Sequence, residues 1–154
     1  MTRFASGHYL SRADTTIPVT VDYPWTICCW IKLEDDTVSY YQPIWSFGQN
    51  NGTGQDDETI YIRTTKHATE NRASKLSFHM DAGATSLWLS TTDVADLKAE
   101  WLFIAVVRSA ANSTVIYTRF RSATSLTSVS SGTSSAAPTL DTFRIGAYSN
   151  GGAS

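Results

Sequence analysis

The chain has 154 residues, of which 42% are hydrophobic and 17% are charged, and its formal net charge is −2. That length suits one domain, and five Trp, seven Tyr and six Phe supply the side chains for its core. The small net charge and the absence of a basic run exclude nucleic-acid binding driven by phosphate contacts. No apolar run approaches the roughly 20 residues of a membrane-spanning helix, so we expect neither a nucleic-acid nor a membrane partner.

The first clear strand signal is the segment Trp25–Leu33. Its odd-numbered positions are all apolar, whereas Thr26, Cys28 and Lys32 interrupt the other face. This period of two predicts a strand with one face against a core and one open face. Trp30 falls on the open face, where a large aromatic side chain needs a partner, a ligand or a second layer.

Cys28 and Cys29 are the only cysteines of the chain. Neighbouring residues on a strand point to opposite faces, so these two thiols cannot form a disulfide with each other. We therefore expect no disulfide, which favours assembly in a reducing compartment. The segment Phe4–Leu10 already has the character of a strand, so we expect no secretory signal.

Further short strands are predicted at regular spacing, as in a sandwich or barrel. Ile44–Gly48 is a short aromatic strand, and a long polar loop covers Asn50–Glu58. A meander of three strands is then expected at Thr59–Thr65, Lys75–Met80 and Ser86–Ser90.

The second half of the chain contains the most apolar strand. Trp101–Arg108 is almost continuously apolar, which predicts a strand buried on both faces, and Asn112–Ala123 is its expected partner. Thr124–Ala137 consists almost entirely of Ser, Thr, Ala and Gly. Two interpretations of it stay open: an extended low-complexity loop, or a weak edge strand around Leu126 and Val129.

These motifs in this order carry a resemblance to a known superfamily. A Trp-containing strand comes early, the Trp101–Arg108 strand follows, and Phe143-Arg144-Ile145-Gly146 closes the series. The pattern resembles the laminin G-like and concanavalin A-like lectin/glucanase jelly-roll superfamily, over about Phe4 to Gly146. The resemblance implies an all-β fold, a two-sheet antiparallel β-sandwich. The family's Asp-Gly turn is absent, because Arg119-Phe120-Arg121 occupies its place.

The end of the chain also differs from the resembled family. There the closing strand is followed by one more strand, whereas this chain stops at Ser154. A missing strand leaves an open sheet edge with unpaired backbone groups. We therefore expect a single jelly-roll domain over residues 1–154 without its final strand, either as a fragment of a longer protein or with the edge covered by another segment or chain.

No catalytic signature is present. Glycosidases of the resembled superfamily use a Glu-x-Asp-x-x-Glu set along one strand, and no predicted strand carries it. His8, His67 and His79 are far apart in sequence, and no Gly-x-Ser-x-Gly elbow occurs. We expect a protein that is not an enzyme.

Calcium is the one cofactor that the resemblance implies, since many relatives bind it through loop carboxylates. The candidate ligands here are Asp56, Asp57 and Glu58 in the polar loop. The alternative is a solvated acidic loop that holds no ion.

The candidate binding residues lie on the open face of the meander. If its Ile, Leu, Phe and Met side chains point inward, then Tyr61, Arg63, His79 and Trp88 point outward on one face, joined by Trp30 if its strand lies in the same sheet. Flat aromatic rings beside polar groups suit the stacking of sugars. Trp, Tyr and Arg equally suit a protein interface. A third possibility is that a loop or the Ser/Thr-rich segment covers them.

Together these features favour a non-enzymatic interaction module. We expect a structural or decoration component of a larger assembly such as a phage virion, assembled in the host cytoplasm as a homo-oligomer or with other protein subunits. The alternative is an extracellular carbohydrate-binding module or lectin that recognises a cell-surface or polysaccharide glycan. Because one fold serves many functions, the functional expectation draws on these residues as well as on the resemblance.

Overall fold

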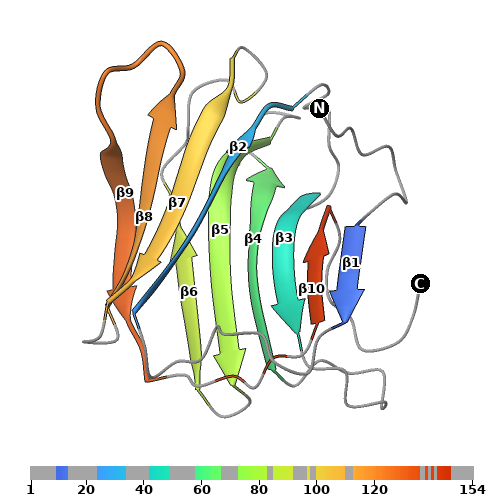
Figure 1. Ribbon diagram of the computed structural model, residues 1–154. Coiled ribbons are helices and arrows are strands. Elements are labelled where there is room, and N and C mark those ends of the chain that lie inside the picture. Colours follow the sequence, from blue (N-terminus) through green and yellow to red (C-terminus); the bar gives the residue numbers. More distant parts are fainter. Residues whose placement is uncertain are drawn as a thin grey trace.

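The computed structural model describes residues 10–13, 24–33, 42–48, 58–66, 73–82, 85–91, 97, 100–109, 113–135, 138, 140 and 142–146. Within these ranges the chain forms ten β-strands in two antiparallel sheets and no α-helix. The described residues therefore include no helix that is long and apolar enough to cross a membrane. The expected all-β, two-sheet jelly-roll sandwich is confirmed (Figure 1).

The larger sheet has six strands in the order β1-β10-β3-β4-β5-β6. All neighbouring pairs run antiparallel. The strands of this sheet are β1 (Leu10–Ala13), β10 (Thr142–Ile145), β3 (Gln42–Gly48), β4 (Glu58–Lys66), β5 (Ala73–Ala82) and β6 (Ser86–Ser90). The predicted meander is thus confirmed as β4-β5-β6, while the closing strand β10 lies between β1 and β3.

The smaller sheet has four strands in the order β2-β7-β8-β9. They are β2 (Trp25–Ile31), β7 (Leu102–Arg108), β8 (Ser113–Phe120) and β9 (Thr127–Thr133). The predicted partner of the apolar strand is confirmed, because β8 pairs with β7 along its whole length. The Ser/Thr-rich segment is resolved in favour of an edge strand, β9, which pairs only with β8.

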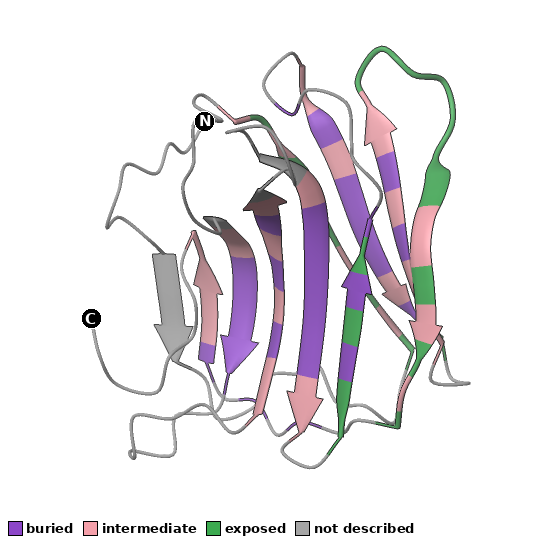
Figure 2. Ribbon diagram, turned by 180° about the vertical axis from the view of Figure 1, so that it is seen from behind, coloured by how far each residue is buried: buried purple, intermediate pink, exposed green. Residues whose placement is uncertain are grey.

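Alternation of side chains separates the core from the surface in both sheets. Along β6, Leu87 and Leu89 are buried whereas Ser86, Trp88 and Ser90 are exposed, and Figure 2 shows this alternation as successive colours on the strand. The strand β2 alternates in the same way. The hydrophobic positions of each sheet therefore face the other sheet, as the period of two predicts.

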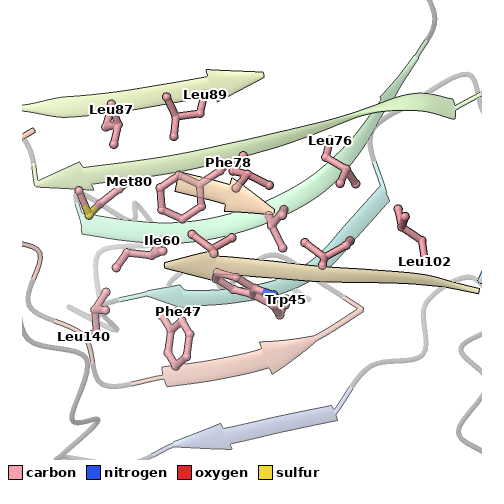
Figure 3. Packing of buried hydrophobic residues seen from close by; sticks show 14 of the residues in the cluster. Trp45, Phe47, Ile60, Leu76, Phe78, Met80, Leu87, Leu89, Leu102 and Leu140 are labelled. Carbon is pink, nitrogen blue, oxygen red and sulfur yellow. The ribbon is translucent and has the colours of Figure 1, made fainter. Parts of the chain in front are cut away.

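The core between the sheets is built around Phe78, which is fully buried on β5. Its ring centroid lies 6.4 Å from that of Trp25 on β2 and 6.4 Å from that of Trp45 on β3. Figure 3 shows how the aliphatic and aromatic side chains of several strands meet around it. The buried members of this cluster are Trp45, Phe47, Ile60, Ile62, Leu76, Phe78, Met80, Leu87, Leu89, Leu97, Leu102, Ile104, Val106, Ile116 and Leu140.

The edge strands of the two sheets approach closely at Gly132 on β9. A Cβ atom at this position would lie 2.7 Å from Leu89 Cδ2 and 3.1 Å from Leu87 Cδ1 on β6. Any larger side chain would therefore push against buried leucines, so glycine permits the sheets to close at this edge.

The expectation that Trp101–Arg108 is buried on both faces is wrong. On β7 the inward residues Leu102, Ile104 and Val106 are fully buried, but Phe103 and Val107 on the other face are only half-buried. The smaller sheet forms one layer of a two-layer sandwich, so only one of its faces meets the core. Phe103 and Val107 on that face are therefore partly exposed, whereas the small side chain of Ala105 between them is buried.

The last residue of β7, Arg108, carries a charge into the interior. Its side chain is fully buried and donates hydrogen bonds to Thr114 Oγ1 at 3.2 Å and to the Ser134 carbonyl oxygen at 2.7 Å. Burial lowers the pKa of the Arg108 guanidinium. These hydrogen bonds compensate part of the cost of burying the charge and tie β7, β8 and the end of β9 together.

Candidate functional site

Three of the predicted surface residues stand in one row across the large sheet. In the strand register Tyr61 on β4 pairs with His79 on β5, and His79 pairs with Trp88 on β6. Arg63 lies two residues beyond Tyr61 and so projects from the same face of β4. The structure therefore brings together the four residues that alternation assigned to this face, which we call the Trp88 cluster (Tyr61, Arg63, His79 and Trp88).

The side chains of the Trp88 cluster are in mutual contact. The His79 and Trp88 rings are stacked, with their centroids 3.7 Å apart and an interplanar angle of 25°. Tyr61 meets Trp88 edge-on at 6.1 Å. The guanidinium carbon of Arg63 lies 5.2 Å from the Tyr61 ring centroid and 5.4 Å from that of Trp88, within the range of cation–π attraction.

Within the cluster, His79 forms the buried base and Trp88 the exposed part. His79 is buried on the outer side of the sheet, whereas Trp88 is 53% exposed. Neither ring nitrogen of His79 has a hydrogen-bond partner among the described residues, although Nε2 lies 3.8 Å from Asp81 Oδ2. Burial lowers the pKa of His79, opposed by Asp81 and reinforced by Arg63. The ring is therefore mainly neutral near pH 7 and acts as an aromatic support for Trp88.

Trp30 does not belong to this cluster, because its strand lies in the other sheet. β2 pairs with β7, so Trp30 is on the outer face of the small sheet, on the opposite side of the sandwich. There Trp30 is 41% exposed. Its ring centroid lies 5.3 Å from that of Phe103 and 5.4 Å from the guanidinium carbon of Arg119. We call these three residues the Trp30 cluster.

The sequence alone does not single out the partners of Trp30. Phe103 lies in a strand for which burial on both faces is expected, so no surface residue is expected there. The signal in the sequence is Arg119, a charged residue at an outward-facing position of the partner strand. Because Phe103 faces it across the ladder, the two belong to the same face.

The described part of the Ser/Thr-rich segment does not cover the Trp88 cluster. Residues Thr127–Thr133 form β9 at the edge of the small sheet, and the Trp88 side chain stays exposed. Cover by this part of the segment is therefore excluded.

The expected calcium ligands are only partly visible. Asp56 and Asp57 lie outside the described residues, and Glu58 is the first residue of β4. Among the residues that the structure describes, no group of three or more His, Cys, Asp or Glu side chains is placed to hold a metal ion. Calcium binding stays a prediction.

Comparison with known proteins identifies the fold. No family model and no curated protein matches the sequence. Among solved structures, the crystal structure of the LG1-3 region of the laminin alpha2 chain is similar, with a TM-score of 0.60 and 14% sequence identity. The match covers 89% of this chain and 24% of that chain, so this chain spans about a quarter of the laminin structure. The likeness shows a laminin G-like jelly-roll fold.

Proposed function

We propose that the protein is a non-enzymatic interaction module whose Trp88 cluster packs against another protein subunit in a larger assembly, such as a phage virion. The observation that carries the proposal is the half-exposed Trp88 ring, held in place by His79 and flanked by Tyr61 and Arg63. Trp, Tyr and Arg are the residues that dominate binding energy in protein interfaces. The laminin G-like fold is in keeping with a binding role.

The geometry of the rings favours a protein partner. The Trp88 side chain is already stacked on His79, so it loses little conformational freedom when a partner covers it. Tyr61 stands at 80° to Trp88, so the two rings do not offer a coplanar pair of stacking surfaces. An exposed indole that rests on a buried ring fits a pocket of another protein. We propose that this partner includes further copies of the same chain, in a homo-oligomer.

Sedimentation velocity over a range of concentrations tests this proposal. We expect the intact chain to self-associate and Trp88→Ala to weaken association by about thirtyfold or more, as for an interface hot spot. Trp30→Ala is the matched control, because it removes an exposed tryptophan from the opposite face. A chain that stays monomeric at the highest concentrations, or one whose association Trp88→Ala leaves unchanged, contradicts the proposal.

A second candidate function is carbohydrate binding, and one observation favours it. Trp88 lies on the edge strand β6 and exposes its indole beside the cation of Arg63, an arrangement on which a sugar ring can stack. A glycan array probed with the intact chain and with Trp88→Ala distinguishes the two functions. A glycan signal that Trp88→Ala abolishes, from a protein that sediments as a monomer, would replace the assembly role with a lectin role. Repeating the array with calcium and with a chelator tests the calcium prediction.

A further inference from the structure

The outer face of the small sheet carries a second organised surface. Trp30, Phe103 and Arg119 occupy one row of the ladder across β2, β7 and β8. The guanidinium of Arg119 reaches past Phe103 to the Trp30 ring. Trp30 is 41% exposed, and both of its partners are half-buried. The row is therefore a fixed aromatic–cation contact with one exposed tryptophan.

The adjacent positions extend this row with two more cations. Arg121 follows β8, and its backbone N–H donates a hydrogen bond to the Trp101 carbonyl at 2.9 Å, which continues the pairing of β7 with β8 by one residue. Lys32 follows β2, and both Lys32 and Arg121 are exposed. Three cations and three aromatic rings thus gather at one end of this face. They are Lys32, Arg119 and Arg121, with Trp30, Trp101 and Phe103.

The carboxylate of Glu100, next to Trp101 in the chain, bonds to Ser122 and not to these cations. Both oxygens of Glu100 accept hydrogen bonds from Ser122, one from its backbone N–H at 2.9 Å and one from its hydroxyl at 2.6 Å. These hydrogen bonds lower the pKa of Glu100. Among the described residues none of the three cations forms an ion pair. Among the described residues this end of the face therefore carries more positive than negative charge, three cations against the carboxylate of Glu100.

The same face becomes apolar away from the cations. The next rows contain Ala105 beside Tyr117, and Val107 beside Val115. Ala105 is buried, and the other three are half-buried. An aliphatic strip thus adjoins the cationic end across the central strands β7 and β8.

We propose that this face binds an acidic polypeptide surface in which apolar side chains adjoin carboxylates. The apolar groups would cover the strip of Val107 and Val115, and the carboxylates would pair with the cations around Trp30. Charge complementarity of this kind steers association and fixes the orientation of the partner. The proposal concerns the opposite side of the sandwich from the Trp88 cluster, so it does not depend on the function proposed above.

Two other polyanions fit the face less well. Strong binding to nucleic acid uses many phosphate contacts, whereas this face offers three cations. A base or sugar that stacks on Trp30 from the side of Arg119 must displace the guanidinium that already lies over the ring. Neither a phosphate backbone nor a sulfated polysaccharide uses the aliphatic strip, which an apolar protein surface can cover.

Fluorescence anisotropy with labelled polymers tests the proposal on the intact chain. The acidic probe is a random copolymer of glutamate and tyrosine, and the competing polyanions are oligothymidylate and dextran sulfate. We expect the copolymer to bind, added salt to weaken binding, and Arg119→Gln and Trp30→Ala each to raise its Kd by about fivefold or more. Ser90→Ala, at an exposed position on the outer face of the large sheet, is the control and should leave the Kd within about twofold. Circular dichroism verifies that each variant is folded.

Each result of the anisotropy experiment either supports or overturns the proposal. Copolymer binding that depends on Arg119 and Trp30 supports the proposal. Absence of copolymer binding, or binding that both variants leave unchanged, overturns it. Tighter binding of oligothymidylate or dextran sulfate with the same dependence on Arg119 also overturns it, since the ligand is then a different polyanion. None of these outcomes alters the sedimentation test of the Trp88 cluster.

Discussion

The outer faces of the two sheets carry the same kind of tryptophan–arginine contact in different surroundings. Each presents one exposed tryptophan in contact with an arginine, Trp88 with Arg63 and Trp30 with Arg119. On the large sheet the tryptophan rests on the buried His79, and its neighbours are polar. On the small sheet it adjoins an aliphatic strip and further cations.

Similar clusters can therefore imply different partners. An aromatic side chain fixed on a buried ring is suited to fill a pocket, whereas an apolar strip with a charged end is suited to a broad, oriented contact. The two faces stand back to back on one core, so substitutions can test what they share and then what separates them.

The largest effect is expected from the shared core. Phe78→Ala removes a fully buried ring that contacts both Trp25 and Trp45, and should lower the free energy of unfolding by about 3–5 kcal/mol. Urea denaturation measures this loss. Trp88→Ala, at an exposed site, should cost less than about 1 kcal/mol. Similar losses in the two variants would mean that Trp88 belongs to the core.

The next effect concerns the edge at which the two sheets meet. Gly132→Val places side-chain atoms against Leu87 and Leu89 and should cost about 1–3 kcal/mol through overpacking. Thermal unfolding of this variant should be compared with that of Ser131→Val, an exposed neighbour on the same strand. Equal midpoints would show that β6 and β9 do not pack as tightly as described.

A smaller effect is expected on the pH dependence of stability, through His79 on the outer face of the large sheet. Because burial lowers the pKa of His79, with Asp81 opposing and Arg63 reinforcing the shift, the unfolded chain binds a proton more readily than the folded chain. The contribution of His79 to the free energy of unfolding should therefore be fully present above pH 6.5. It should be lost as the pH drops through 6.5 toward the lower pKa of the folded chain. Denaturation of the wild type and His79→Gln between pH 7 and 5 checks this, and the variant should show a flatter dependence. Parallel pH profiles of the wild type and His79→Gln would show that His79 does not cause the pH dependence.

The smallest effect is a difference in reactivity on the strand of Trp30. Burial, with a further contribution from Cys28, raises the pKa of Cys29 to about 11. The Cys29 side chain packs against the core, whereas Cys28 is exposed. Both cysteines are free thiols. Roughly 0.1% of Cys29 is thiolate at pH 8, so maleimide should modify Cys28 rapidly and Cys29 only on unfolding. Cys28→Ser should abolish the rapid phase, and Cys29→Ser should preserve it. Rapid labelling of Cys28→Ser would contradict the assigned faces of β2.

Alternation along single strands made much of this structure predictable. The pattern of Trp25–Leu33 and of the three meander strands correctly assigned inward and outward residues, and so placed Tyr61, Arg63, His79 and Trp88 on one face. Alternation describes each strand alone, and it does not tell which strands share a sheet.

That limit decides two cases. Trp30 joins the Trp88 cluster only if its strand lies in the same sheet, and pairing with β7 puts it on the other side of the sandwich. The run that contains Phe103 predicts burial on both faces, because a continuous apolar run looks the same whether its second face meets a layer or solvent. Pairing between distant segments decides both cases, and such pairing leaves little trace in local sequence.

The central claim is that assembly covers the Trp88 cluster, and hydroxyl-radical footprinting tests it most directly. The intact chain is labelled at concentrations below and above the onset of association, and the oxidation of Trp88 is compared with that of Trp30 in the same samples. We expect association to reduce the oxidation of Trp88 strongly and to leave that of Trp30 nearly unchanged. Equal oxidation of Trp88 at both concentrations would contradict it.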